Sequence, residues 1–228
     1  MSEDKLSKAV ITRRQILNAA EKLIVEKGYE SASMRDITQL AGVNLAAVNY
    51  HFGSKDALIA AVLKRRLGAI NKERLEKLDA LEARAAGKPV RPSQLIYAFF
   101  GSLVAHAGED DHDGNIYLKI LEQTMLSPSD FVTSVVAQEN ALVFERYRKA
   151  FFKAMPDVPE EEILWRFQFM LGATSYAISG IQALLEHTEN IDTSKINLSD
   201  KRLRKRLLSF LLGGLYAPLP KFRETNQD

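Results

Sequence analysis

The stretch AGVNLAAVNYHFGSK, residues 41–55, places small side chains and hydrogen-bonding tips between two glycines. Alanine lets a helix backbone approach a ligand closely and offers a methyl group to thymine, and asparagine can bind adenine with two hydrogen bonds. Val48 and Phe52 lie four residues apart and therefore share one helix face. The spacing predicts that these two side chains point inward and that Ala46, Ala47, Asn49 and Tyr50 point elsewhere, toward base edges in DNA.

Further donors in the same region could reach a DNA backbone. Ser33 and Arg35 begin the preceding helix, where backbone N–H groups and the helix dipole favour phosphate. Tyr50, His51 and Lys55 carry donors on arms of phosphate-reaching length. Basic residues near the N-terminus could form an arm along the backbone or minor groove: Lys5, Lys8, Arg13 and Arg14.

Three short helices must position these residues. The first is predicted over 12–27, where Thr12 and Gln15 have capping-box spacing and Gly28 follows. The second and third, 33–41 and 44–52, are separated by a short turn containing glycine, which is the arrangement of a helix-turn-helix. A small core is expected from these inward residues: Ile37, Leu40, Val43, Val48 and Phe52, with Leu17, Leu23 and Ile24. The alternative is a helical hairpin with a polar face and no DNA partner.

The rest of the chain predicts helices throughout, because no strand-like alternation is sustained. Six further helices are expected, which makes about nine in an all-α fold: 55–86, 93–107, 115–125, 128–155, 160–187 and 199–212. We expect a helix-turn-helix DNA-binding domain over 1–54. A ligand-binding and dimerisation domain is expected over 55–228.

Composition limits the classes of function. The 228 residues include no cysteine, which excludes thiolate metal sites and suits a reducing cytoplasm. Residues 1–66 hold 11 Lys/Arg against 7 Asp/Glu, so that region is mildly basic and favours a polyanion partner. The N-terminus lacks the apolar core of a secretory signal. Residues 167–185 carry no charge, but their polar residues favour a buried helix over a membrane span.

Two charged segments have ordinary explanations. The acidic and histidine residues of 106–113 match no metal-binding spacing, so a solvated loop is expected and no metal or cofactor is predicted. KRLRKR at 201–206 could bind nucleic acid, but Leu203 and Leu207 continue an apolar stripe, which favours the wet face of a helix. An all-α enzyme is disfavoured, because the four histidines form no acid–base or metal pattern.

The run from Thr12 to about Leu63 closely resembles the TetR family of one-component transcriptional regulators. The matching residues are ILNAAEKLIVEKGYESASMRDITQLAGVN and VNYHFGSKDAL. The 41–55 stretch and LWRFQFMLGATSYAISGIQAL look most like the PsrA-type, fatty-acid-responsive subgroup. By the family's pattern, base contacts map to Leu45, Ala46, Ala47, Asn49 and Tyr50. Phosphate contacts map in the same way to Ser33, Arg35, His51 and Lys55.

The resemblance also implies an all-α homodimer whose two reading helices meet a near-palindromic operator. Small residues in the helix at 160–187 allow another helix to approach, and the last helix has an apolar side. The expected dimer contacts are Gly172, Ala173, Ala177, Gly180, Leu203 and Leu207. The alternative is that both helices are ordinary internal core.

An apolar pocket between the C-terminal helices would hold a small-molecule effector. Its expected lining is Phe99, Phe100, Tyr117, Phe144, Trp165, Arg166, Phe169 and Met170. Arg166 could meet a carboxylate or an acyl head group, or it could simply be exposed. We therefore expect a cytoplasmic repressor that releases DNA on binding a long-chain fatty acid or acyl-CoA. The rival hypothesis is an all-α carrier or interaction protein whose N-terminal hairpin is structural.

Overall fold

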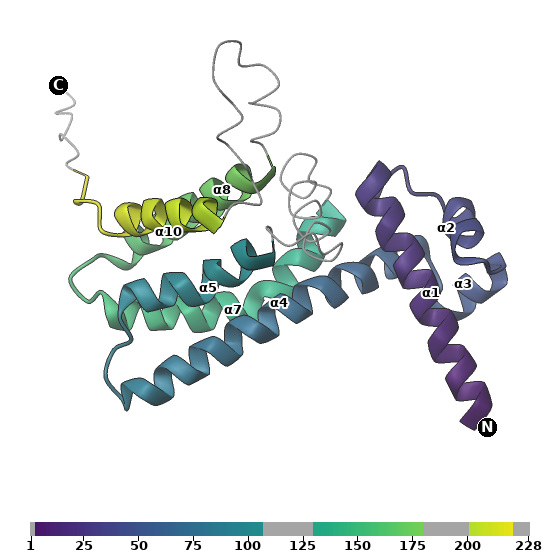
Figure 1. Ribbon diagram of the computed structural model, residues 1–228, viewed down its shortest axis with the longest axis horizontal. Helices are drawn as coiled ribbons and strands as arrows, with labels where there is room; N and C mark the ends of the chain where they lie inside the picture. The colour runs from purple at the N-terminus through teal and green to yellow at the C-terminus, as the bar shows by residue number, and fades with distance from the viewer. Residues whose placement is uncertain (1–2, 107–129, 180–200, 221–228) are drawn as a thin grey trace, which may run out of the picture. The chain divides into compact units, whose positions relative to one another are not determined.

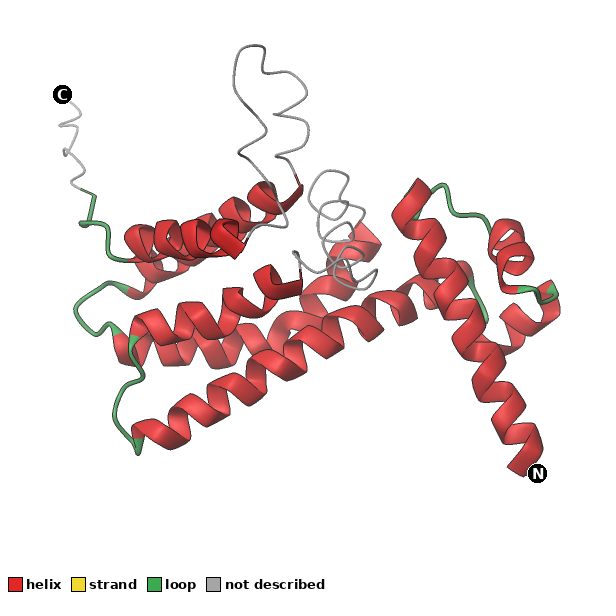
Figure 2. Ribbon diagram, viewed as in Figure 1, coloured by secondary structure: helices red, strands yellow, loops and turns green. Residues whose placement is uncertain are grey.

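The protein is all-helical over residues 3–106, 130–179 and 201–220, which are the residues that the computed structural model describes (Figure 2). The helices are α1 (Glu3–Lys27), α2 (Met34–Ala41), α3 (Leu45–Phe52), α4 (Lys55–Ala85), α5 (Pro92–His106), α7 (Asp130–Ala154), α8 (Glu160–Ser179) and α10 (Lys201–Leu215). Each of them corresponds to a predicted helix, so the expected all-α fold is confirmed. The predicted helix at 115–125 lies outside the described residues.

The chain forms two compact units. The first consists of Met1–Glu73 with Glu109–Leu142, and the second of Arg74–Gly108 with Val143–Asp228. Helices α4 and α7 therefore contribute residues to both units. The predicted boundary between residues 54 and 55 stays a prediction.

In the first unit, α1, α2 and α3 pack on one another, and the C-terminal half of α1 supplies most of the shared core (Figure 1). The buried residues include Ile16, Leu17, Ala20, Leu23, Ile24, Ile37 and Val48. Gly28 ends α1 with a φ of 81°, a left-handed conformation that glycine adopts without a steric cost. The predicted core is thereby confirmed for Leu17, Leu23, Ile24, Ile37 and Val48 but not for every member.

The start of α1 differs from the prediction. The helix begins at Glu3, so Thr12 lies inside it and does not cap it. Residues 3–11 contain neither glycine nor proline, and a helix that is already packed extends through such residues at little cost. The capping-box spacing of Thr12 and Gln15 was therefore a false start signal.

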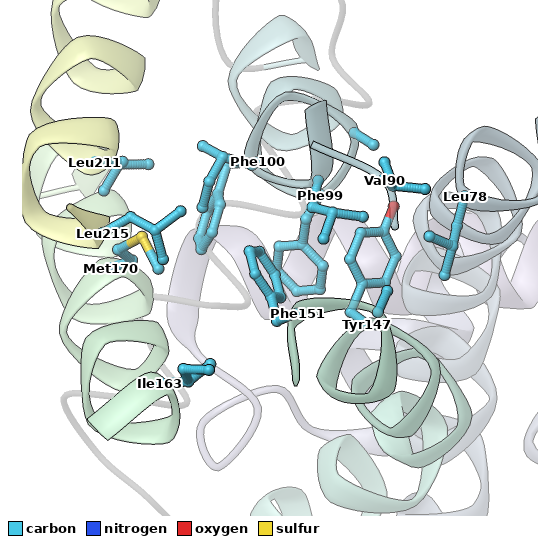
Figure 3. Packing of buried hydrophobic residues seen from close by; sticks show 14 of the residues in the cluster. Leu78, Val90, Phe99, Phe100, Tyr147, Phe151, Ile163, Met170, Leu211 and Leu215 are labelled. Atoms are coloured by element: carbon cyan, nitrogen blue, oxygen red, sulfur yellow. The ribbon is translucent and has the colours of Figure 1, made fainter. Parts of the chain in front are cut away.

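The second unit is built around a continuous apolar core. Side chains of α4, α5, α7, α8 and α10 meet there, as Figure 3 shows for Leu78, Phe99, Tyr147, Met170 and Leu211. The Tyr147 hydroxyl donates to the backbone carbonyl oxygen of Arg74 at 2.9 Å. Burial raises the pKa of the Tyr147 phenol well above its ordinary value, so this hydroxyl stays a hydrogen-bond donor at neutral pH.

Candidate nucleic-acid interface

Local hydrogen bonds fix the turn between α2 and α3. Gly42 ends α2 in the left-handed conformation with a φ of 66°, and its N–H donates to the carbonyl oxygens of Thr38 and Gln39. Asn44 then caps α3, because its side-chain oxygen accepts a hydrogen bond from the N–H of Ala47 at 2.8 Å. Gly53 ends α3 directly after its eight residues. The result is a short, well-bounded helix-turn-helix.

Helix α3 is anchored by one side chain. Val48 is fully buried, whereas Leu45, Ala46, Asn49 and Tyr50 are exposed, and 82% of Tyr50 is accessible. Ala47 and His51 are half-buried. The predicted outward face is therefore accessible along its length, with Ala47 and His51 at its margins.

Leu40 was predicted to face the core, and that prediction is wrong. The residue is 45% exposed. It borders a groove of about 330 Å³ between α1 and α2, whose α1 side carries polar residues including Asn18 and Lys22. Because those side chains prefer water, the two helices do not close over Leu40. Val43 and Phe52 are half-buried at the edge of the same small core.

The predicted phosphate contacts surround the start of α2 and the end of α3. Ser33 caps α2, since its hydroxyl oxygen accepts from the N–H of Asp36 at 3.1 Å. A hydrogen bond from Ser33 and the charge of Lys27 lower the pKa of the Asp36 carboxyl below its ordinary value. Arg35 is exposed in the first turn of α2. Lys55 donates to the carbonyl oxygen of Glu30 at 2.7 Å, and an ammonium has two further donors for a phosphate.

A buried ion pair ties α1 to α4 in this unit, and the sequence analysis missed it. Glu21 is 2% exposed and accepts hydrogen bonds from Arg65 and Arg66. Arg65 also donates to the side-chain oxygen of Asn18 at 2.8 Å. The sequence did offer a signal for this ion pair, because Glu21 lies among the apolar residues of α1, next to Ala20 and two residues before Leu23. A charge at such a position indicates a buried partner.

In the second unit, six aromatic rings form a cluster, which we call the aromatic cluster: Phe99, Phe100, Phe144, Tyr147, Phe151 and Phe167. Phe167 lies near its centre, with ring centroids 4.8 Å from Phe99 and 5.9 Å from Phe151. Of the predicted ligand contacts, Phe99, Phe100 and Phe144 are members, and Met170 belongs to the same core. Tyr117 lies outside the described residues.

The other predicted ligand contacts lie elsewhere in this unit. Trp165 and Phe169 are 53% and 65% exposed and stack on each other with centroids 5.8 Å apart. Arg166 is buried and donates to the carboxylate of Glu162 at 2.8 Å and to the carbonyl oxygen of Leu215 at 2.6 Å. Its guanidinium therefore holds the C-terminal end of α10 onto α8.

The structure instead places a buried cation beside the aromatic cluster. Arg74 is 2% exposed, its Cζ lies 3.9 Å from the centroid of the Phe99 ring, and its Nε donates to the Phe99 carbonyl oxygen. One turn further along α4, Lys77 donates to the hydroxyl of Ser102 at 2.7 Å. The sequence did indicate that Arg74 is buried, because it lies four residues from both Ile70 and Leu78 and therefore shares a helix face with these two apolar residues.

Of the predicted dimer contacts, one is exposed and three pack against the core of their own subunit. Gly172 is exposed, whereas Ala173 and Ala177 pack partly against the core of their own subunit. Leu207 is buried in that core as well. Gly180 lies outside the described residues, and Leu203 lies on α10. The exposed apolar residues of these helices are different ones: Leu164, Trp165, Phe169, Tyr176 and Phe210.

The predicted absence of a membrane span and of a metal site can be compared only with the described residues. None of the helices in the described ranges is long and apolar enough to cross a membrane. Those ranges also hold no group of three or more His, Cys, Asp or Glu side chains that could bind a metal ion. Most of the 106–113 loop lies outside them. Lys205 and Arg206 are exposed, as the predicted wet face of the last helix requires.

Solved structures share this fold over most of the chain. Salmonella enterica GusR matches with a TM-score of 0.55 and 22% identity, over 90% of this chain and 96% of that one. The fatty acid degradation regulator FadR from Bacillus halodurans matches with a TM-score of 0.62 and 16% identity, over 91% and 97%. AibR, solved with isovaleryl coenzyme A and operator DNA, matches with a TM-score of 0.61 and 15% identity, over 91% and 100%.

Curated sequence relatives match over a shorter part of the chain. The HTH-type transcriptional regulator UidR of Escherichia coli K12 is 38% identical over 63 residues, 28% of this chain and 32% of that protein. The HTH-type transcriptional repressor Rv1474c of Mycobacterium tuberculosis is 39% identical over 64 residues, 28% of this chain and 33% of that protein. The matched part thus spans about a third of the length of these curated relatives.

Family models cover both units of the chain. The model described as bacterial regulatory proteins, tetR family, matches residues 16–62, which contain α2, α3 and most of the core of α1. The model described as tetracyclin repressor-like, C-terminal domain, matches residues 97–214, more than half of the sequence. The chain belongs to the TetR family of bacterial regulatory proteins.

Proposed function

We propose that the protein is a DNA-binding transcriptional regulator, and specifically a repressor that an apolar ligand releases from its operator. The observation that carries the proposal is helix α3. It is held by the buried Val48 and presents Ala46, Asn49 and Tyr50 to solvent between two capped ends. A helix of this size fits the major groove, where such side chains can distinguish base pairs.

The contacts divide by chemistry. Base edges would be read by Leu45, Ala46, Ala47, Asn49 and Tyr50, and phosphates would be bound by Ser33, Arg35, His51 and Lys55. Ser33 has two tasks in this scheme, since its oxygen caps α2 and its position brings a phosphate near the free N–H groups of the first turn. Arg35 and Lys55 supply the positive charge.

A homodimer would present two copies of α3 to two half-sites of a near-palindrome. The exposed apolar residues of α8 support this proposal. Trp165, Phe169, Gly172 and Tyr176 follow one another at intervals of three or four residues and therefore share a helix face. An apolar face of this kind is typical of a protein–protein interface. We call these four residues the dimer face, and Phe210 on α10 offers a further exposed ring.

The effector would be an acyl chain with an anionic head, such as a long-chain fatty acid or its CoA thioester. The aromatic cluster offers apolar contacts, and the buried Arg74 beside it offers a positive charge for a carboxylate or phosphate. The resemblance to PsrA-type regulators points the same way. Among structures of the same fold, AibR was solved with isovaleryl coenzyme A and FadR is a fatty acid degradation regulator.

Release requires that the ligand prefer one conformation of the protein, because equal affinity for two states shifts nothing. Helix α4 is the candidate lever. It is one unbroken helix from Lys55 to Ala85 and carries Lys55 at one end and Arg74 two-thirds of the way along. A change in the surroundings of Arg74 could therefore alter the setting of the helix that begins beside the proposed DNA contacts.

The test is selection of operator DNA from a pool of genomic fragments, followed by a mobility-shift titration of the selected site against a scrambled duplex of the same length. We expect retention of a near-palindromic site at least tenfold more tightly than the scrambled duplex. Equal, weak affinity for every duplex would contradict the proposal. If the protein then still bound acyl chains, the rival hypothesis of a carrier would replace it.

A further inference from the structure

The N-terminal part of α1 lies outside the core of its unit. The buried residues of this helix begin at Ile16, and residues 8–15 include no buried side chain. Val10 and Ile11 are exposed there, and Lys8, Arg13 and Arg14 carry three positive charges with no acid among them. The segment stays helical because it continues a helix that is already packed. Figure 1 shows this end of α1 running on past α3.

One residue of the segment touches the proposed reading helix. The Arg13 guanidinium lies over the Phe52 ring, with Cζ 4.9 Å from the ring centroid. Arg13 precedes Ile16 and Leu17 by three and four residues, so it extends the buried stripe of α1 toward α3. Phe52 is the last residue of α3, where the helix dipole also favours a cation.

The chemistry of this contact leaves the charge available. A guanidinium that stacks on a ring by its face keeps its five N–H donors at its edge, in the geometry that suits a phosphate. Among the described residues, the Arg13 side chain is exposed and forms no ion pair or hydrogen bond. Other arginines are bound to protein acceptors: Arg65, Arg66, Arg74, Arg146 and Arg166.

We propose that Arg13 is a DNA phosphate-binding residue, positioned by the Phe52 ring at the C-terminal end of α3. The inference rests on the proposed DNA-binding function and deepens it. An arginine held at that place ties the α1 segment and the reading helix to the same stretch of DNA backbone. It would thereby fix how far along the groove α3 lies. Phe52 is a positioning residue in this scheme and touches no nucleotide.

The experiment compares Arg13→Ala with Arg148→Ala in the full chain. Arg148 is the matched control, because it is an exposed arginine that also lies over a ring, with Cζ 5.9 Å from the Phe152 centroid, but it belongs to α7 and to none of the proposed DNA contacts. Affinity for the selected operator and for a scrambled duplex is measured at several salt concentrations. We expect Arg13→Ala to weaken both by about tenfold, as loss of a charge-assisted hydrogen bond does, and to reduce the salt slope by about 0.9. Arg148→Ala changes neither quantity, and Arg13→Lys keeps the slope while losing part of the affinity.

A double-mutant cycle tests the role of the ring. Phe52→Leu weakens binding in the wild-type background and has no further effect beside Arg13→Ala, because the ring acts through the guanidinium. Thermal unfolding is followed for every variant, and Arg13→Ala is expected to melt like the wild type. Equal losses for Arg13→Ala and Arg148→Ala, additive effects in the cycle, or a binding loss matched by lost stability would each overturn the inference. If the wild type itself binds no duplex selectively, the proposed function fails instead.

Discussion

Asn49 and Tyr50 are the two residues that follow the buried Val48 of α3, yet both side chains are exposed. We predict that Asn49→Ala and Tyr50→Ala each weaken binding to the selected operator by ~1–3 kcal/mol, the range for a lost base contact. Their free energies of unfolding should stay within about 0.5 kcal/mol of the wild type, because surface substitutions seldom cost more. Fluorescence anisotropy and urea unfolding give the two quantities. Unchanged operator affinity in both variants would rule out α3 as the reading helix.

Asp36 gives the first unit a dependence on pH. Its pKa lies below the ordinary value of 3.8, because Ser33 hydrogen bonds to the carboxylate and Lys27 lies 3.5 Å away. A carboxyl whose pKa is lowered by folding stabilises the folded state above its unfolded pKa, and this contribution disappears as the pH falls through the folded pKa.

We therefore predict that Asp36→Asn is less stable than the wild type at neutral pH and that the difference vanishes in acid. Urea unfolding at neutral pH and at a series of pH values below 3.8 measures it, because the carboxyl is protonated in both the folded and the unfolded protein once the pH is below the folded pKa. Glu145→Gln on α7 is the comparison outside the helix-turn-helix. The pKa of the Glu145 carboxyl is also lowered, by Lys149. A pH-independent penalty for Asp36→Asn would mean that packing, and not charge, is the cause.

At the scale of elements, the turn between α2 and α3 depends on backbone conformation more than on space. An added Cβ at Gly42 would meet no atom within 4 Å, but the φ of 66° is one that other residues rarely adopt. We predict that Gly42→Ala lowers the free energy of unfolding by ~1–2 kcal/mol, the cost of a left-handed alanine. Gly172→Ala is the control, because that glycine is helical and has equally open surroundings. Equal effects on unfolding would contradict the backbone explanation.

Local signals made the element order predictable. Caps such as Ser33 and Asn44, and glycines such as Gly28 and Gly42, act within a few residues, so the sequence alone indicates where α2 and α3 begin and end. The start of α1 was missed because a capping-box spacing inside a good helix-forming run looks the same as one at its end. Local pattern cannot distinguish them when nothing upstream breaks the helix.

The site was predictable only as far as it lies on one helix. The outward face of α3 follows from the burial of Val48, whereas the exposure of Leu40 depends on polar residues of α1 that face it. Phe99, Phe100, Phe144 and Met170 of the expected pocket lining lie in one core, whereas Trp165 and Phe169 are exposed for a related reason. Trp165 and Phe169 are apolar residues of α8, and an apolar residue can be buried either inside its own subunit or against another one. Periodicity does not separate these two cases.

The assembly of the whole molecule is the next prediction. Phe169→Glu places a charge in the dimer face, and burying a phenylalanine is worth about 1.5–3 kcal/mol. We expect this variant to sediment as a monomer at micromolar concentration and to lose operator affinity, because one half-site is then lost. Tyr97→Glu on α5 is the matched control, since it changes another exposed aromatic residue. Ala173→Leu should instead reduce subunit stability, because Ala173 packs on its own core. A wild-type monomer, with and without DNA, would refute the proposed dimer.

Release by a ligand also concerns the whole molecule. Each buried CH₂ contributes ~0.8 kcal/mol, so saturated acids should release the operator more strongly with length, to a limit near about twelve to eighteen carbons. Arg74→Met should weaken release by every acid more than release by the matching alcohol, because it removes the positive charge beside the aromatic cluster. The titration uses the preformed protein–DNA complex, and thermal unfolding verifies that the variant is folded. Release by a polar metabolite with acyl chains inert would contradict the proposed ligand class.

Val48 is the single buried residue of an eight-residue helix that is capped at both ends. The residues that keep α3 folded are therefore different from the residues that we propose read DNA. Substitutions at Ala46, Asn49 and Tyr50 are therefore expected to leave stability nearly unchanged, so the operator preference can change while the scaffold stays constant. A library randomised at those three positions should consist mainly of folded proteins, and selection from it could retarget the regulator to new promoters.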